Sequence, residues 1–320
     1  MQKKLLSGDE AVALAALDAG VALGTGYPGT PSTEILEAFS ALGGHARWAP
    51  NEKVALEVGL GAAYGAARVL VTMKHVGVNV AADPLFTAAY TGVSGALVVV
   101  SADDPGMASS QNEQDNRRYA VAAGLPMLEP ADAQEAYDLF FTAVEISERW
   151  KLPVLYRMTT RVCHSKSLVL PRAARQPPRP AFFERDIQGR VMIPAYARPA
   201  HRRLRAKLAE IAAFAEGAAL ARVEEGDRRL GIVTAGVSYL HAAEAAPAAS
   251  FLKLGMVHPL PLERVRRFAA AVLEERLAAP ELSLVVARRP CILAAADIRK
   301  WEKQAEARHE AQDCSACGEG

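Results

Sequence analysis

Two kinds of hydrophobic pattern alternate along the first half of the chain. Short apolar runs rich in β-branched residues are separated by longer segments whose apolar residues recur at helical spacing. The runs predicted as strands are an apolar run that begins at Val21 and leads into a Gly-rich turn, and the stretches Arg68–Met73, Ala96–Ser101 and Pro153–Met158. The segments predicted as helices follow Ser7 and Pro31 and cover Lys53–Ala67 and Asp132–Trp150. This alternation predicts the α/β class, with a doubly wound parallel sheet and right-handed crossovers.

The second half of the chain predicts a smaller α/β domain after a linker. Residues 171–200 are rich in proline and arginine and show little periodicity, which is typical of a surface linker. A helix is predicted over 201–225, strands over 230–235, 251–257 and 282–287, and helices over 241–246 and 262–277. The predicted divisions are 1–168 for the first domain, 169–227 for the linker and its helix, 228–300 for the smaller domain and 301–320 for a tail.

Signals for helix ends mark the first part of the chain. Ser7 and Glu10 form a capping-box pattern, and the helix that they open is expected to stop near Gly20. After the next apolar run, Thr30 is predicted as an N-cap with Pro31 at the first helical position. The free N–H groups of that helix would favour an anion.

A glycine pattern in the same stretch matches a dinucleotide fingerprint, Gly24-x-Gly26-x-x-Gly29. We do not favour nicotinamide or flavin binding, because Pro28 and Pro31 stiffen the turn. The acidic residue that would contact a ribose, Glu52, is also expected on a loop after Pro50 rather than at a strand end.

Composition narrows the class of protein. The 320 residues contain 37 Lys plus Arg and 36 Asp plus Glu, so bulk charge does not favour nucleic acid or a membrane surface as a partner. The N-terminus lacks the apolar core of a signal peptide, and no uncharged apolar run is long enough for a bilayer. We therefore expect a soluble, cytoplasmic protein.

Cysteine usage agrees with this expectation. Of the 4 cysteines, Cys163 and Cys291 stand alone, and Cys314 and Cys317 form a single C-x-x-C. One such pair is half of a four-thiolate site, so it is either part of a frayed tail or half of a site that a partner completes. No complete set of metal ligands is predicted within this chain.

Polar residues follow the predicted strands where each one ends. A long polar loop, Asp103 to Arg117, comes directly after the strand 96–101, and another loop begins at Lys74 after the strand 68–73. Open parallel sheets bind their ligands at this edge, so these loops are the predicted binding region.

Three stretches of these loops resemble a known family. They read Gly26-Tyr-Pro-Gly-Thr-Pro-Ser-Thr-Glu34; Asn51-Glu-Lys-Val-Ala55 leading to Met73-Lys-His-Val-Gly-Val-Asn-Val-Ala-Ala-Asp-Pro84; and Ala102-Asp-Asp-Pro-Gly-Met-Ala-Ser-Ser-Gln-Asn-Glu-Gln-Asp-Asn-Arg117. Together, in this order, they resemble the thiamine-diphosphate-dependent 2-oxoacid:ferredoxin oxidoreductases, closest to the alpha subunit of indolepyruvate ferredoxin oxidoreductase. The resemblance covers roughly residues 1–285. It implies that the first domain is of the pyrimidine-binding type and that the smaller one is transketolase C-terminal-like.

The resemblance also implies roles for single residues. A carboxylate at Glu52 is implied to hydrogen-bond the aminopyrimidine and activate the cofactor, for which a partly desolvated group is suited, although an ordinary surface glutamate is the alternative. Thr30 is implied to receive the substrate carboxylate, or it only caps the helix. His75 is predicted either to relay a proton or to be a structural histidine. Arg117 would pair with a carboxylate or brace Asp115.

Further residues complete the predicted site. The predicted substrate-binding residues are Thr30, Ser109, Ser110 and Arg117; the predicted cofactor-binding residues are Gly29, Glu52, Lys74, Asn79 and Gln111. One position departs from the family pattern, in which a histidine precedes the serine pair, because Ala108 stands there. This change removes a polar group from the expected pocket.

Two absences imply partner chains. The sequence has no G-D-G motif with a downstream asparagine for Mg²⁺ and the diphosphate, and no multi-cysteine run for [4Fe–4S] clusters. The sequence from Val285 to Cys291 and the sequence of the tail also differ from the family pattern. The resemblance therefore implies a stand-alone pyrimidine-side subunit or a truncated product. The implied partners are a diphosphate-binding subunit that carries Mg²⁺, a gamma/beta-type subunit with iron–sulfur clusters, and ferredoxin.

The predicted function is that of a subunit in a hetero-oligomeric 2-oxoacid:ferredoxin oxidoreductase. An indolepyruvate-like aryl or branched 2-oxoacid would be decarboxylated on thiamine diphosphate and passed to coenzyme A, with electrons leaving through the partner. The subunit alone is expected to be inactive. Two alternatives stay open, namely a scaffold or regulatory subunit that has lost catalysis, and a subunit of a non-oxidative thiamine-dependent decarboxylase.

Overall fold

The structure is a computed structural model that describes residues 2–172, 175–217 and 220–278. The chain divides into two compact units, Met1–Glu275 and Arg276–Gly320. Of the second unit, only the residues that end the last described helix belong to the described ranges. The predicted strand 282–287, Cys291, Cys314 and Cys317 lie outside them.

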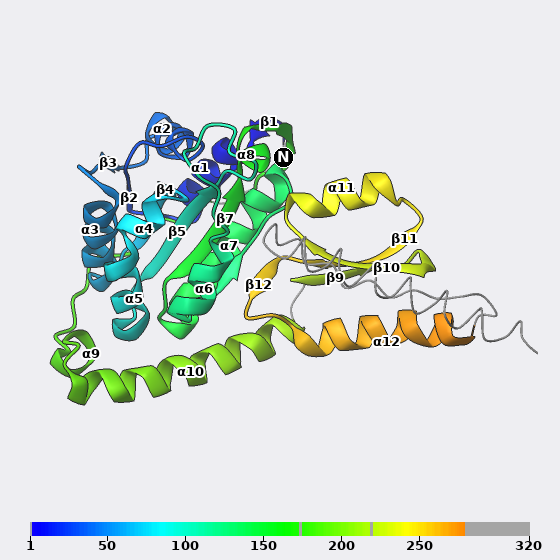
Figure 1. Cartoon of the computed structure of the whole chain (residues 1–320). Helices are drawn as coiled ribbons and strands as arrows, with labels where there is room; N and C mark the ends of the chain where they lie inside the picture. The colour runs from blue at the N-terminus through cyan, green and yellow to red at the C-terminus, as the bar shows by residue number, and fades with distance from the viewer. Residues whose placement is uncertain (1, 173–174, 218–219, 279–320) are drawn as a thin grey trace, which may run out of the picture. The chain divides into compact units, whose positions relative to one another are not determined.

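A seven-stranded sheet forms the centre of the first unit (Figure 1). Its strand order is β12-β6-β7-β5-β4-β2-β3, and every neighbouring pair is parallel except β12 and β6. Its strands are β2 (Leu23–Gly26), β3 (Ala46–Trp48), β4 (Arg68–Lys74), β5 (Ala96–Asp103), β6 (Met127–Leu128), β7 (Val154–Thr159) and β12 (Met256–His258). The predicted α/β class with a doubly wound parallel sheet is confirmed.

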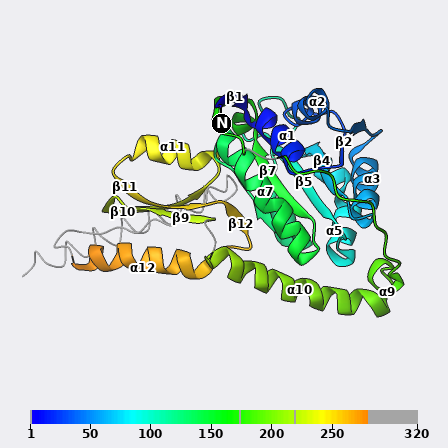
Figure 2. The same ribbon diagram turned by 180° about the vertical axis from the view of Figure 1, so that it is seen from behind.

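Helices cover both faces of this sheet, as Figures 1 and 2 show. One face carries α1 (Gly8–Asp18), α2 (Thr33–Ala41) and α7 (Ala133–Trp150), and the other α3 (Glu52–Tyr64), α5 (Ala82–Thr91) and α6 (Arg117–Ala123). Because both faces are covered, the central strands are buried along their whole length, and β5 has no exposed residue. This burial explains the β-branched, uninterrupted character of the central runs.

The first residues of three helices show which of the predicted capping signals set a helix start. The capping box of α1 is confirmed, since Glu10 N–H donates to Ser7 Oγ at 3.1 Å and Ser7 N–H donates to Glu10 at 2.7 Å. The prediction for α2 was wrong: this helix begins at Thr33 after Ser32, so Thr30 is not its N-cap and Pro31 lies outside it. Glu52 was expected on a loop, yet it opens α3, because Asn51 caps the helix by accepting from Val54 N–H at 2.9 Å.

Segments between the sheets hold more regular structure than the sequence indicated. A two-stranded antiparallel ribbon of β1 (Lys4–Ser7) and β8 (Lys166–Val169) was not predicted. Short helices α4 (Gly77–Val80), α8 (Thr160–His164) and α9 (Ile187–Arg190) lie in predicted loops or linker. The helix predicted over 201–225 is α10 (Pro194–Gly217), which starts inside the predicted linker and packs against α5 and α7.

The smaller sheet has three strands, in the order β10-β11-β9. It comprises β9 (Ala221–Glu224), β10 (Asp227–Ala235) and β11 (Ala249–Leu254), accompanied by α11 (Val237–Ala245) and α12 (Leu262–Ala278). The strand predicted over 251–257 is in fact two, because the chain turns after Leu254 and β12 joins the large sheet beside β6. Among the described helices, none is both long and apolar enough to cross a membrane.

Candidate functional site

The candidate site lies at a switch point of the large sheet. The neighbouring parallel strands β2 and β4 lead into helices α2 and α5 on opposite faces, so the loops that follow these strands diverge. Such divergence leaves a crevice at the carboxyl edge of the sheet, where doubly wound folds bind ligands. The first loop (residues 27–32) and the second (residues 74–79) meet here.

The first loop is held by its own polar groups. Gly29 N–H donates to Thr33 Oγ1 at 2.8 Å, and the Ser32 hydroxyl donates to the Gly29 carbonyl at 2.8 Å. Thr30 is exposed, and its hydroxyl has no partner among the described residues. A Cβ at Gly29 would stand 3.1 Å from Lys74 Cβ, so glycine permits the close contact between the two loops.

Glu52 projects from the start of α3 toward the second loop. Its residue is only 9% exposed, and no described residue forms a hydrogen bond or ion pair with its carboxylate. A Cβ at Gly77 would stand 2.6 Å from both Cγ and Oε1 of Glu52, so the glycine opens the space that this side chain occupies. The side chain is mostly buried, yet its carboxylate oxygens are not among the fully enclosed atoms, so a ligand that enters the crevice can accept or donate hydrogen bonds there.

The second loop connects with the third loop (residues 104–116). The Lys74 ammonium donates to the Ser109 carbonyl at 2.9 Å. His75 is completely buried, with Nε2 at 3.0 Å from the Asn112 carbonyl oxygen, and its Nδ1 has no partner in the described part of the chain. Asn79 exchanges hydrogen bonds with Gln114 and accepts one from the Tyr119 hydroxyl at 2.6 Å.

Asp104 organises the tip of the third loop. Its carboxylate accepts from Ser109 N–H at 2.8 Å, the Ser110 hydroxyl at 2.6 Å and the Thr160 hydroxyl at 2.8 Å. Burial by itself raises the pKa of Asp104, but the hydrogen bonds from Ser110, Ser109, Thr160 and Ala108 outweigh it and lower the pKa to about 2. The Ala108 contribution comes from its backbone N–H, which needs no side chain.

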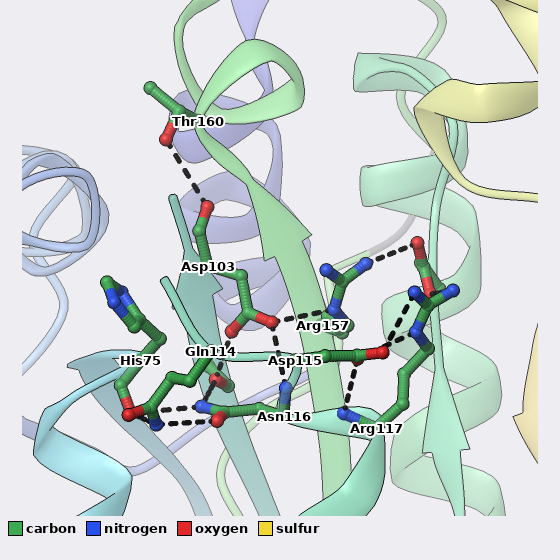
Figure 3. Close-up of polar contacts among 10 residues, drawn as sticks. His75, Asp103, Gln114, Asp115, Asn116, Arg117, Arg157 and Thr160 are labelled. Carbon is green, nitrogen blue, oxygen red and sulfur yellow. Dashed lines mark hydrogen bonds and ion pairs between the residues drawn. The ribbon is translucent and has the colours of Figure 1, made fainter. Parts of the chain in front are cut away.

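A network of buried charged side chains contacts the third loop (Figure 3). The Arg157 guanidinium donates to Asp103 at 2.7 Å and to Glu129 at 2.6 Å, and Asp103 also accepts from Asn116 N–H at 3.2 Å. Burial alone would lower the pKa of Arg157, but Glu129 and Asp103 raise it, so the guanidinium stays charged. Asn116 further donates to the Ser101 hydroxyl at 2.6 Å.

The predicted site residues fall into two groups. Most are brought to the carboxyl edge, Glu52 at the start of α3 and the others on the three connected loops: Gly29, Thr30, Lys74, His75, Asn79, Ser109 and Ser110. Gln111 is exposed, and no described residue forms a hydrogen bond with its side chain. Arg117 forms a fork on Asp115, at 2.8 and 3.1 Å, and lies 3.9 Å from Glu129. It therefore braces the end of the loop in this structure (Figure 3).

Sequence reasoning did not single out the residues that support the loops, which are Asp103, Asp104, Gln114, Asn116, Glu129, Arg157 and Thr160. One signal was present, namely two acidic residues directly after a buried strand. The pairing of Arg157 with Asp103 could not be found from the sequence, because β7 and β5 become neighbours only through the sheet topology.

A separate cavity lies away from these loops. It has a volume of about 750 Å³ and is bounded by α7, β9, α11 and β11, with Glu135, Arg222 and Lys253 among its charged lining residues. None of the predicted site residues lines it, and its mixed charges do not match the predicted chemistry.

Comparisons with known proteins identify relatives of this chain. A family described as "Pyruvate flavodoxin/ferredoxin oxidoreductase, thiamine diP-bdg" matches residues 14–183, which contain all three loops. The protein named "Indolepyruvate oxidoreductase subunit IorA" from Methanothermobacter thermautotrophicus is 42% identical over 280 residues, covering 84% of this chain and 45% of its own. Its namesake from Archaeoglobus fulgidus is 40% identical over 282 residues, with the same shares. The chain thus spans about half the length of the curated relatives that it matches.

A solved structure shares the fold. It is described as 2-oxoglutarate:ferredoxin oxidoreductase from Magnetococcus marinus with 2-oxoglutarate, coenzyme A and succinyl-CoA bound. It matches with a TM-score of 0.69 and 18% identity, covering 84% of this chain and 56% of that chain. At this identity the match supports the fold alone.

Proposed function

The chain belongs to the pyruvate flavodoxin/ferredoxin oxidoreductase family, and from this premise we propose that it supplies the pyrimidine side of a thiamine diphosphate site. The observation that carries the proposal is Glu52, a buried carboxylate without a partner among the described residues, set in a space that Gly77 leaves open. Its position at the switch point of the sheet is where a ligand of this fold class binds.

The residues present fit the pyrimidine end of the cofactor. When bound, thiamine diphosphate supplies the carbanion chemistry by which a 2-oxoacid loses carbon dioxide. Glu52 would hold or release a proton at its carboxylate beside the ring nitrogen. A ligand seated there would exclude water from the carboxylate, which would strengthen that hydrogen bond.

Other residues of the three loops would hold the substrate and shape the pocket. The exposed Thr30 hydroxyl is free to donate to a 2-oxoacid carboxylate, and Lys74 places positive charge between Gly29 and Ser109. Ser110 donates a hydrogen bond to Asp104, which fixes its hydroxyl on the third loop. His75 and Asn79 would position the loops, while Gln111 is free to contact a ligand.

We further propose that the whole enzyme is a 2-oxoacid:ferredoxin oxidoreductase of the indolepyruvate type. Its reaction would convert an aryl or branched 2-oxoacid and coenzyme A to an acyl-CoA and carbon dioxide, and the electrons released would pass through [4Fe–4S] clusters of a partner to ferredoxin. The described loops offer no second set of residues for the diphosphate and Mg²⁺, so a diphosphate-binding domain or subunit would complete the site. The names of the relatives support this assignment.

Co-purification of the tagged chain from its own cells tests the proposal. The complex should contain thiamine diphosphate and iron, and it should reduce a viologen dye only when a 2-oxoacid and coenzyme A are both present. Indolepyruvate, 2-oxoisovalerate and 2-oxoglutarate should be compared as substrates. Decarboxylation without dye reduction would instead support a non-oxidative decarboxylase. A complex without thiamine diphosphate and without turnover would support a scaffold subunit.

A further inference from the structure

Three potential ligand side chains meet outside the three loops of the candidate site. Asp9 lies in the first turn of α1, Glu34 in the first turn of α2, and His164 at the end of α8. One ligand atom of each lies within 4.8 Å of the other two, and His164 Nε2 is 3.9 Å from Glu34 Oε1. Since the three residues come from three separate elements, the fold and not local sequence brings them together.

Close backbone packing produces this meeting. A Cβ at Gly8 would collide with the carbonyl oxygen of Val162, so the glycine lets the start of α1 approach α8. Contacts between α1 and α2 bring Glu34 to the same place. Neither Asp9 nor Glu34 serves as a helix cap, because Ser7 and Glu10 fill the capping box of α1 and α2 has no side-chain cap.

Asp9 lacks the partners that a buried carboxylate needs. The residue is 1% exposed, and no described residue forms a hydrogen bond of regular geometry with either carboxylate oxygen. The nearby thiol of Cys163 is buried and is only a weak donor. A cation bound to these oxygens would supply the missing partner.

The other two ligands keep the cluster open to solvent. The side chains of His164 and Glu34 are 44% and 47% exposed, so an ion can reach Asp9 past them. In a tetrahedral zinc site with metal–ligand bonds of about 2.1 Å, neighbouring donor atoms lie about 3.4 Å apart. The His164–Glu34 distance exceeds this value by a margin that side-chain rotation can close.

We propose that Asp9, Glu34 and His164 form a binding site for a divalent transition-metal cation of the Zn²⁺ type. Two carboxylate oxygens and one imidazole nitrogen suit such a cation, and three protein ligands leave one position open for water. The bound ion joins the starts of α1 and α2 to α8. Because Thr160, the first residue of α8, holds Asp104, the ion steadies one support of the third loop.

Calorimetric titration of the full chain with ZnCl₂ tests the site, with the tail cysteines replaced by serine (Cys314→Ser, Cys317→Ser) so that their thiolates do not compete. We expect one equivalent to bind with a Kd in the micromolar range or below, and the Tm to rise and return after chelation. Glu34→Gln and His164→Gln change exposed side chains, so they should leave the fold intact. Each should weaken binding at least tenfold, and Asp9→Asn should do the same.

Controls on the same part of the molecule make the result specific. Glu37→Gln lies on the exposed side of α2 and His45→Gln on an exposed turn, and both should leave Zn²⁺ binding unchanged. Co²⁺ bound in place of Zn²⁺ should show the visible absorption bands of a cobalt ion that has oxygen and nitrogen ligands. Failure to bind Zn²⁺, a thiolate charge-transfer band with Co²⁺, or equal affinity in Glu34→Gln and His164→Gln would each overturn the proposal.

Discussion

The Lys74 ammonium donates a hydrogen bond to the Ser109 carbonyl oxygen at 2.9 Å, joining loops that follow two adjacent strands of the sheet. On its other side the Lys74 stem packs against Gly29, whose missing side chain makes room for it. One side chain therefore holds three segments in register at the edge where we place the ligand.

Lys74→Met should raise the KM for the 2-oxoacid with a smaller effect on kcat. The methionine keeps the apolar packing on Gly29 but loses the hydrogen bond to Ser109 and the positive charge. Since the bond is exposed, stability should change by less than about 1 kcal/mol. Steady-state kinetics of the complex measure this, with Lys53→Met on α3 as the control. Identical kinetics for both variants would remove Lys74 from the site.

Gly77→Ala should reduce turnover although it adds only a methyl group. The new Cβ would stand 2.6 Å from Cγ and Oε1 of Glu52, so the carboxylate must move from its place. A displaced catalytic group loses activity steeply with distance, and we expect a loss of about 10²-fold. The matched control is Gly61→Ala, where a Cβ meets no described atom within 4 Å. Equal turnover in the two variants would contradict the placement of Glu52.

Asp104→Asn should remove stability that depends on pH. Because the folded-state pKa is lowered from 3.8 to about 2, the carboxylate stabilises the fold above pH 3.8 and loses this effect as the pH falls toward 2. The difference in unfolding free energy between wild type and variant should be about 1–2 kcal/mol near neutral pH and should shrink below about pH 4. Denaturant titrations at several pH values measure it. A difference that persists unchanged at pH 3 would show that the charge is not responsible.

Arg157→Met should destabilise the fold strongly. The substitution leaves Asp103 and Glu129 buried without their shared cation, and breaking such a pair costs about 3–5 kcal/mol. Arg117→Met removes an arginine whose side chain is 47% exposed, and its expected cost is below about 1 kcal/mol. Chemical denaturation of the two variants gives the comparison. Equal losses would mean that the buried network contributes no more than the surface pair.

Elements whose signal is local could be predicted from the sequence. The capping box at Ser7 and Glu10, the helix predicted over Asp132–Trp150 and the buried runs of β4 and β5 all depend on neighbouring residues, and the structure has them at or near the predicted positions. The loop edge was predictable for a related reason, since parallel strands end together wherever the chain places them.

Other features depend on contacts that the sequence does not display. The structure starts α2 at Thr33, whose hydroxyl accepts a hydrogen bond from Gly29 N–H, and it divides the predicted strand 251–257 so that β12 pairs with β6 of the large sheet. The supports of the third loop, Asp104 with Thr160 and Asp103 with Arg157, join residues more than fifty positions apart. Their side chains meet only after the sheet has formed.

Glu52→Gln in the purified complex shows whether the Glu52 carboxylate activates thiamine diphosphate. Glutamine keeps the shape but cannot exchange the proton, so we expect turnover to fall by about 10²–10⁴-fold. The fold should remain intact by circular dichroism, and Glu57→Gln on the exposed side of α3 should keep full activity. Turnover in Glu52→Gln equal to that in Glu57→Gln would contradict the account.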